Sequence, residues 1–391
     1  MWLGNLRLVL PDQVVARGAV RIEGGTVAAI AEGEAPGPAI DGRGLTLIPG
    51  LVDLHGDMIE KEVEPRPGAP FPLPVAVAEL DRRLAASGVT TAYAGVSFAE
   101  TRDRGHLRSE EKARGIVEAV MAARDGLLVD LRVHARFEVT NARAEPVLRE
   151  LVGRELVHLV SLTDHTPGQG QYRQLEHYVS YYVRAHGHDA AAVEAEARAR
   201  MAAREATPLA WEVAQGVTGL ARERGIPIAS HDDDTPEKVR VMQALGATIS
   251  EFPVTVAAAA EARHLGLATL MGAPNALRGG SMTGNISALT LAEAGLLDAL
   301  AADYHQGAML PAVFAYARTG VMPLPEAIAL VTRNPARAVG LEDRGAVAEG
   351  QRADLALVED RGDAPPRIRA TLRAGVPVYS DGTLRLDGLV A

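Results

Sequence analysis

The amino-acid sequence predicts an α/β protein: a (β/α)8 TIM-type barrel with a small β-sandwich formed from both ends of the chain. Residues 49–340 alternate short apolar runs with helical runs, which is typical of a parallel sheet covered by helices. The flanking residues 1–48 and 341–391 consist instead of short strand-like runs separated by glycine and proline. A chain of 391 residues can hold one large barrel and one small module.

The two flanking segments both contain brief apolar or alternating runs. In the N-terminal segment these runs are residues 6–10, 19–22 and 27–30, and Gly24-Gly25 is a hairpin signal. In the C-terminal segment they are residues 353–358, 368–372 and 376–379. Because the two ends share this character, we expect residues 1–48 and 341–391 to form one composite sandwich.

The central segment contains eight candidate strands: residues 51–57, 90–96, 131–139, 157–164, 226–231, 248–252, 268–272 and 300–303. Helical patterns between them include residues 76–87, 110–124, 236–245 and 255–264. Eight strands alternating with helices match a (β/α)8 barrel. An open doubly wound sheet is the alternative, and it would bind ligand at a single switch point.

One segment departs from this alternation. Residues 176–204 form a long, charged helical stretch after the fourth strand. We interpret it as a helical excursion into solvent, and the alternative is a cap over the mouth of the barrel.

Composition excludes several classes of protein. The chain has no cysteine, so disulfides, thiolate metal sites and cysteine nucleophiles are excluded. Its net charge of −10 argues against general nucleic-acid binding, which requires basic residues to neutralise phosphates. No apolar run is long enough to span a membrane and no targeting segment is evident. We therefore expect a cytoplasmic protein.

Titratable residues gather where the predicted strands end. In a barrel these ends converge on one face, where the loops build the site. Imidazole and carboxylate side chains together suit Zn²⁺ and similar divalent ions. We expect one or two divalent ions, with Zn²⁺ as the first candidate, and ligands among six residues: His55, Asp57, Glu138, His165, His231 and Asp303. Asp303, at the end of the eighth strand, is also the candidate general base for water activation.

Two segments could bind an anion. A loop after the seventh strand, Arg278-Gly279-Gly280-Ser281, combines a guanidinium, a hydroxyl and glycines whose amides can face an anion. Arg66 lies between two prolines shortly after the first strand. These residues predict a substrate that carries negative charge.

The strand-end pattern resembles the amidohydrolase superfamily of metal-dependent barrels. The resemblance rests on the run Pro49-Gly50-Leu51-Val52-Asp53 before His55, and on Asn334-Pro335-Ala336 and Gly350-Gln351-Arg352-Ala353-Asp354-Leu355 near the C-terminus. It covers nearly the whole chain and implies a metal-dependent hydrolase.

The chain is also similar to the phosphonate-degradation, PhnM-like branch of that superfamily. The similar strings are Pro65-Arg66-Pro67, residues 161–169, residues 229–233, Glu251-Phe252-Pro253 and residues 271–281. The resemblance implies hydrolysis of α-D-ribose 1-methylphosphonate 5-triphosphate to the 5-phosphate and pyrophosphate. The substrate-binding residues that it implies are Arg66, Gln169, Asn275, Arg278, Gly279, Gly280 and Ser281. Four residues differ from the better-known members: Gly56, Met58, Gly170 and Met282.

Two other functions remain open. The first is an amidohydrolase on the same scaffold that cleaves the C–N bond of an N-acyl or cyclic amide, and the nature of the released product separates it from a diphosphatase. The second is a non-catalytic barrel that binds a ligand or partner. The set of carboxylates and histidines argues against it, because buried carboxylates are costly without a cation. A homo-oligomer is compatible with all of these.

Overall fold

The computed structural model describes residues 1–391 except 100–106, 187–188, 207–210, 282–283, 387 and 389–391. The chain divides into two compact units. The first comprises residues 1–94, 122–132 and 298–391, and the second comprises residues 95–121 and 133–297. No helix within the described residues is long and apolar enough to cross a membrane.

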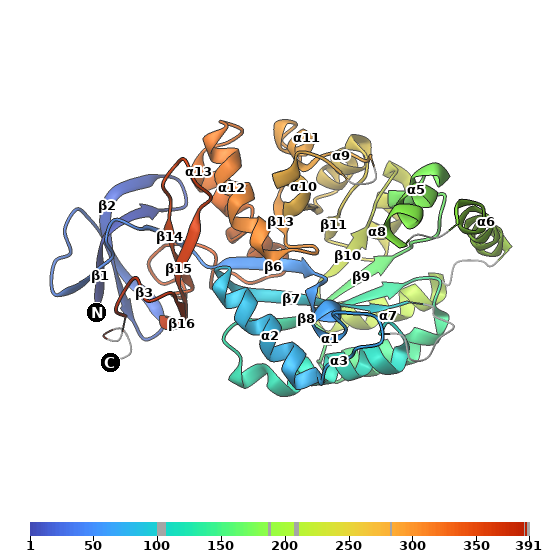
Figure 1. Ribbon diagram of the computed structural model, residues 1–391, viewed down its shortest axis with the longest axis horizontal. Coiled ribbons are helices and arrows are strands. Elements are labelled where there is room, and N and C mark those ends of the chain that lie inside the picture. Colours follow the sequence, from blue (N-terminus) through green and yellow to red (C-terminus); the bar gives the residue numbers. More distant parts are fainter. Residues whose placement is uncertain (100–106, 187–188, 207–210, 282–283, 387, 389–391) are drawn as a thin grey trace. The chain divides into compact units, whose positions relative to one another are not determined.

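One sheet of the first unit is built from both ends of the chain (Figure 1). Its strands are β1 (Trp2–Val9), β2 (Val14–Glu23), β3 (Thr26–Glu32), β4 (Ala39–Asp41), β5 (Thr46–Pro49), β14 (Leu355–Glu359), β15 (Arg367–Arg373) and β16 (Val376–Ser380). They are ordered β16-β15-β14-β5-β1-β2-β3, with β4 also paired to β1. The antiparallel pair of β14 and β5 joins the two ends, so the expectation that they fold together is confirmed. The exact boundaries at residues 48 and 341 stay a prediction.

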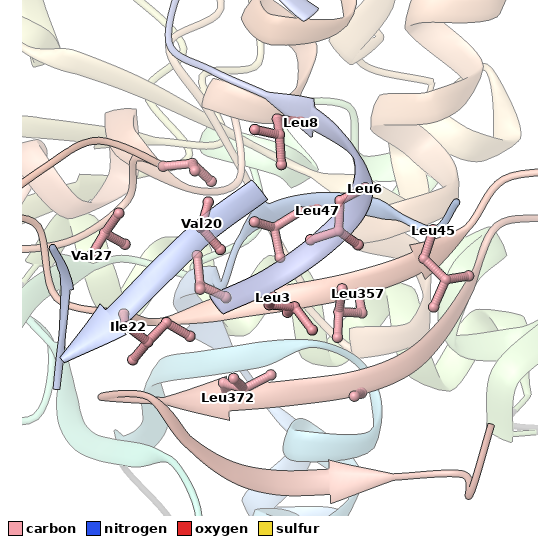
Figure 2. Packing of buried hydrophobic residues seen from close by; sticks show 14 of the residues in the cluster. Leu3, Leu6, Leu8, Val20, Ile22, Val27, Leu45, Leu47, Leu357 and Leu372 are labelled. Carbon is pink, nitrogen blue, oxygen red and sulfur yellow. The ribbon is translucent and has the colours of Figure 1, made fainter. Parts of the chain in front are cut away.

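Leucines and valines from both ends form the core of this sheet (Figure 2). In β1 the core residues are Leu3, Leu6 and Leu8, a spacing that strict alternation does not produce. Asn5 has a φ of 52°, and the register of β1 against β2 shifts between Leu3 and Leu6. Such a bulge re-aims the side chains that follow it, and asparagine tolerates the left-handed conformation that this one uses.

The second sheet is the barrel. Its strands are β6 (Leu51–Gly56), β7 (Val89–Phe98), β8 (Asp130–Glu138), β9 (Leu159–Thr163), β10 (Ile228–His231), β11 (Ile249–Glu251), β12 (Ala268–Gly272) and β13 (Ala299–Ala301). They are hydrogen-bonded in chain order. An isolated parallel bridge between Gly56 and Asp303 brings the end of β6 beside the residues that follow β13. All eight predicted strands are present, and the (β/α)8 class is confirmed.

The helices are α1 (Met58–Val63), α2 (Leu73–Ala86), α3 (Glu110–Ala123), α4 (Glu145–Gly153), α5 (Leu175–His186), α6 (Ala190–Ala206), α7 (Trp211–Glu223), α8 (Pro236–Ala244), α9 (Val256–His264), α10 (Ala273–Arg278), α11 (Ala288–Glu293), α12 (Met309–Arg318), α13 (Leu324–Ala329) and α14 (Arg333–Ala338). Strands β6 and β7 are buried throughout, as expected for a parallel sheet covered on both faces. The predicted excursion at residues 176–204 corresponds to α5 and α6.

A buried ionic network in the first unit links the start of β8 to the segment before β14. The Arg344 guanidinium is buried, and it donates to Asp130 at 2.8 Å and to Thr91 Oγ1 at 3.0 Å. Burial alone would raise the pKa of Asp130, but Arg132 and Arg344 outweigh it and hold that pKa well below its usual range. The carboxylate of Asp130 therefore stays ionised in the fold.

Candidate active site

In the second unit, the carboxylate that ends β8 holds the loop that follows β9. Glu138 Oε1 accepts the backbone N–H of His165 at 2.9 Å, and Glu138 Oε2 lies 2.7 Å from His165 Nδ1. Thr163 Oγ1 donates to the same oxygen at 3.2 Å. Glu138 therefore fixes both the backbone and the ring of His165. The neighbouring Asp164 accepts the N–H of Thr166 at 3.1 Å through its Oδ1.

A second imidazole lies beside the first. His231 ends β10, and its ring centroid is 5.4 Å from that of His165. Its Nδ1 lies 3.4 Å from Oε2 of the fully buried Glu251, which ends β11. Arg136 Nη2 lies 3.5 Å from His231 Nε2. The His231 ring thus lies between a carboxylate and a guanidinium.

These residues fit a divalent cation. His165, His231 and Asp232 each offer a ligand atom, and the three atoms lie within 4.8 Å of one another. Asp232 Oδ2 is buried, and it accepts no hydrogen bond from the described residues. A buried carboxylate oxygen is costly without a compensating positive charge. Two imidazoles and a carboxylate are a ligand set suited to Zn²⁺.

Asp233 braces the turn after His231. It is fully buried, and its Oδ2 accepts hydrogen bonds at 2.5 Å from the hydroxyls of Ser230 and Ser250. Asp232, between His231 and Asp233, has a φ of 53°. The hydroxyls on β10 and β11 thus hold a sharp left-handed turn, which directs the Asp232 carboxylate toward the imidazoles.

The first unit holds three more of the predicted ligands, His55, Asp57 and Asp303. His55 lies on β6, and its Nε2 is 3.5 Å from Asp57 Oδ1. Asp303 follows β13 in a left-handed conformation, with a φ of 55°. Its N–H donates to the His55 carbonyl at 2.8 Å, and its own carbonyl accepts the N–H of Asp57 at 2.7 Å. The three residues are therefore brought together.

Asp53 was not among the predicted site residues. It is fully buried two residues before His55, and it accepts the N–H groups of His55 at 3.2 Å and Ala302 at 2.9 Å. Burial raises the pKa of Asp53 to about 6, although these two hydrogen bonds oppose the rise. Asp53 thus ties the end of β6 to the end of β13. Its place two residues before His55 on the same strand was the signal that could have found it.

The predicted substrate residues lie apart along the chain. Arg66 is exposed in the turn after α1. Gln169 lines a cavity of about 270 Å³ in the second unit together with Asp164, Asp234 and Lys238. Asn275 connects α10 to α11, because its Oδ1 accepts the N–H of Ala288 at 2.9 Å.

The segment that we expected to be an anion-binding loop begins at the last residue of a helix. Arg278 is the exposed last residue of α10, and Gly279 ends that helix with a φ of 75°. The N–H groups of Gly279 and Gly280 both donate to the Asn275 carbonyl, so they cap the helix, and their role in substrate binding stays a prediction. Ser281 follows and is half-buried. Met282, one of the four departures from the family pattern, lies outside the described residues.

Comparison with known proteins identifies the family. The sequence matches the amidohydrolase family over residues 175–379. It is also 39% identical over 385 residues to the α-D-ribose 1-methylphosphonate 5-triphosphate diphosphatase of Escherichia coli (strain K12), covering 97% of this chain and all of that protein. The chain belongs to the amidohydrolase family. It is a metal-dependent hydrolase, and the clustered histidines and carboxylates are its candidate ligands.

Solved structures of other amidohydrolases share the fold. An N-acetyl-D-glucosamine-6-phosphate deacetylase mutant from Mycobacterium smegmatis has a TM-score of 0.63 at 16% identity, covering 97% of this chain and 99% of that one. A D-hydantoinase from Bacillus sp. AR9 has a TM-score of 0.63 at 14% identity, covering 98% and 96%. These similarities support the barrel with its attached sheet.

Proposed function

We propose that this amidohydrolase is a Zn²⁺-dependent diphosphatase that hydrolyses α-D-ribose 1-methylphosphonate 5-triphosphate to the 5-phosphate and pyrophosphate. The observation that carries the proposal is the 39% identity to a diphosphatase of that substrate, which extends over the whole of the relative. The substrate is a small phosphorylated molecule. The sequence strings that resemble the same branch support the proposal independently of the fold.

We propose metal ligands from both units of the chain. We propose that His165, His231 and Asp232 hold a divalent ion in the second unit, because their ligand atoms converge and Asp232 brings a negative charge. His55, Asp57 and Asp303 are the proposed ligands of the first unit. When bound, such a metal supplies Lewis acidity to a phosphoryl oxygen and makes water more acidic.

The protein residues have separate tasks in this scheme. Glu138 orients His165 through its 2.7 Å contact with Nδ1. Asp303 accepts the proton of the attacking water, whose oxygen forms a bond to the α-phosphorus. The bond between the α-phosphorus and the bridging oxygen breaks, and pyrophosphate leaves with that oxygen. Arg66 and Arg278 are exposed, and each is a proposed phosphate-binding residue of its own unit, since planar guanidinium pairs well with phosphate oxygens.

Product analysis tests this function. Purified protein loaded with Zn²⁺ is incubated with the ribose triphosphate phosphonate, and in parallel with N-acyl amino acids and cyclic amides. We expect release of pyrophosphate, no orthophosphate in the first turnover, and no amine from the amides. Release of amine without turnover of the triphosphate would establish the C–N hydrolase instead. A folded protein that binds less than about 0.2 metal per chain and turns over neither class would be a non-catalytic barrel.

A further inference from the structure

Helices α5 and α6 follow β9 and precede β10 in the chain, and they pack against each other (Figure 1). Tyr172 and Tyr178 are buried and meet edge to face, with ring centroids 5.1 Å apart. Val193 and Ala197 of α6 are buried in the same cluster. The segment of residues 176–204 is therefore more than a helix extending into solvent, because aromatic packing holds α6 against α5.

Helix α6 lies against the loop that carries the metal-ligand candidate His165. Arg200 Nη2 donates to the carbonyl oxygen of His165 at 3.3 Å, and Arg200 Nη1 donates to the hydroxyl of Tyr178 at 3.1 Å. The next residue, Met201, touches the same loop at Gly168, where an added Cβ would lie 2.8 Å from the Met201 Cε. One side of α6 is thus placed directly on the loop.

Both partners of the Arg200 guanidinium are neutral. Within the described part of the chain, no carboxylate lies within 4.0 Å of it, and Arg200 is exposed. Two of the five N–H donors of an arginine are used here, which leaves donors for a ligand. Arg198, two residues earlier, behaves differently, because its guanidinium binds Glu194 Oε1 at 3.0 and 2.6 Å.

The loop itself has little room for a charged side chain at Gly170. This glycine has a φ of 55°, and an added Cβ would lie 3.1 Å from the Cβ of Asp232. A side chain at that position would be strained and would push on a candidate metal ligand. A positive charge beside this part of the loop must therefore come from another element, and α6 supplies one.

We propose that Arg200 determines specificity by binding a phosphate oxygen of the substrate's polyphosphate chain. The inference rests on the proposed function for the identity of the anion. The Arg200 guanidinium is charged, keeps donors for a ligand, and contacts the backbone of the candidate metal ligand His165. Such a group can bind one part of a polyanion whose other part reaches the metal. The carboxylates of Glu138, Asp232 and Glu251 would repel that polyanion in the absence of such a cation.

The alternative is that Arg200 only fastens α6 to the loop. Three variants separate the two roles. Arg200→Gln removes the charge, and Arg198→Gln, as a control, removes a charge of the same helix that is already paired with a carboxylate. Tyr178→Phe removes one hydrogen-bond partner of Arg200 while Arg200 keeps its charge. Each is measured as the Zn²⁺-loaded protein, for KM and kcat with the ribose triphosphate phosphonate. Calorimetric binding of inorganic tripolyphosphate provides a readout that needs no turnover.

We expect Arg200→Gln to raise KM and the tripolyphosphate Kd by about 10- to 100-fold, as for the loss of a hydrogen bond between charged groups. Its kcat should change by less than about threefold, Arg200→Lys should restore part of the affinity, and the other two variants should resemble wild type. Wild-type Kd in Arg200→Gln, or an equal loss in Tyr178→Phe, would overturn the proposal. If Arg200→Gln does not fold, the Arg200→Lys and Tyr178→Phe pair decides, since only the first should weaken tripolyphosphate binding.

The two proposals can fail separately. If the wild-type protein hydrolyses amides and not the triphosphate, the proposed function is wrong. Loss of tripolyphosphate binding in Arg200→Gln would still establish Arg200 as an anion-binding residue of the site.

Discussion

The contact between Glu138 and His165 allows a quantitative prediction. Replacing Glu138 by Gln keeps the size of the side chain, and its remaining oxygen can still accept from the His165 N–H or from Thr163. The 2.7 Å contact with His165 Nδ1 changes from a charge-assisted bond to a neutral one. Charge-assisted bonds are about twice as strong as neutral ones, so the loss is about 1 kcal/mol or more. A partner that orients a metal-binding histidine is generally worth about 10- to 100-fold in metal affinity or activity.

We therefore expect Glu138→Gln to weaken Zn²⁺ binding by about 10- to 100-fold, while the free energy of unfolding of the metal-free protein changes by about 1 kcal/mol. Competition with a chromophoric chelator measures the affinity, and chemical denaturation measures the stability. Glu110→Gln is the matched control, because Glu110 is also a partly buried carboxylate of the second unit and accepts from Asn141 at 3.1 Å. Zn²⁺ affinity within twofold of wild type in Glu138→Gln would refute the orienting role.

Three more outcomes follow from the structure. Asp303→Asn should retain most of the metal but lose about 10²–10⁴-fold in turnover, because an amide cannot accept the proton. Metal analysis and steady-state kinetics measure the two quantities. Near-wild-type turnover would exclude Asp303 as the general base. Arg344→Met should lower the free energy of unfolding by about 1–3 kcal/mol in urea titrations, because Asp130 loses one charged hydrogen-bond donor but keeps Arg132 and Arg124. Since the pKa of Asp130 is depressed in the fold, its stabilisation is present above the ordinary carboxyl pKa near 3.8 and is lost as pH falls below it, so wild type and Arg344→Met should converge in acid. Chelation should abolish hydrolysis and lower the melting temperature, and added Zn²⁺ should restore both; persistent turnover in chelator would contradict metal dependence.

The strands of the barrel could be predicted because each is a short apolar run buried on both faces. The run at residues 268–272 coincides with β12, and most of the other strand ends differ by one or two residues. The end of the eighth strand was harder to place. Strand β13 ends at Ala301, and Asp303 lies beyond it. Asp303 has a left-handed backbone conformation, which the presence of an aspartate in the sequence does not predict.

The site was only partly predictable, because its chemistry depends on which side chains converge. Glu251 follows Ile249 and Ser250 in a strand of three residues, and only its full burial beside His231 gives it a place in the site. The pair Gly279-Gly280 illustrates a second difficulty. Glycine is favoured both in anion-binding loops and after helices, and here it ends a helix. Sequence pattern alone cannot choose between those two uses.

The sheet shared by both ends of the chain has a consequence for biosynthesis. Strand β5 is completed by Pro49, but its partner β14 begins only at Leu355, after about 300 further residues have been made. Until then the edge of β5 exposes unpaired backbone groups, and the cluster around Leu47 lacks its C-terminal members, among them Leu355 and Leu357. The nascent chain therefore exposes an unpaired, aggregation-prone edge strand during most of its translation. Ribosome-bound chains that stop before residue 355 should be the aggregation-prone species, and these are the chains that should bind chaperones most strongly.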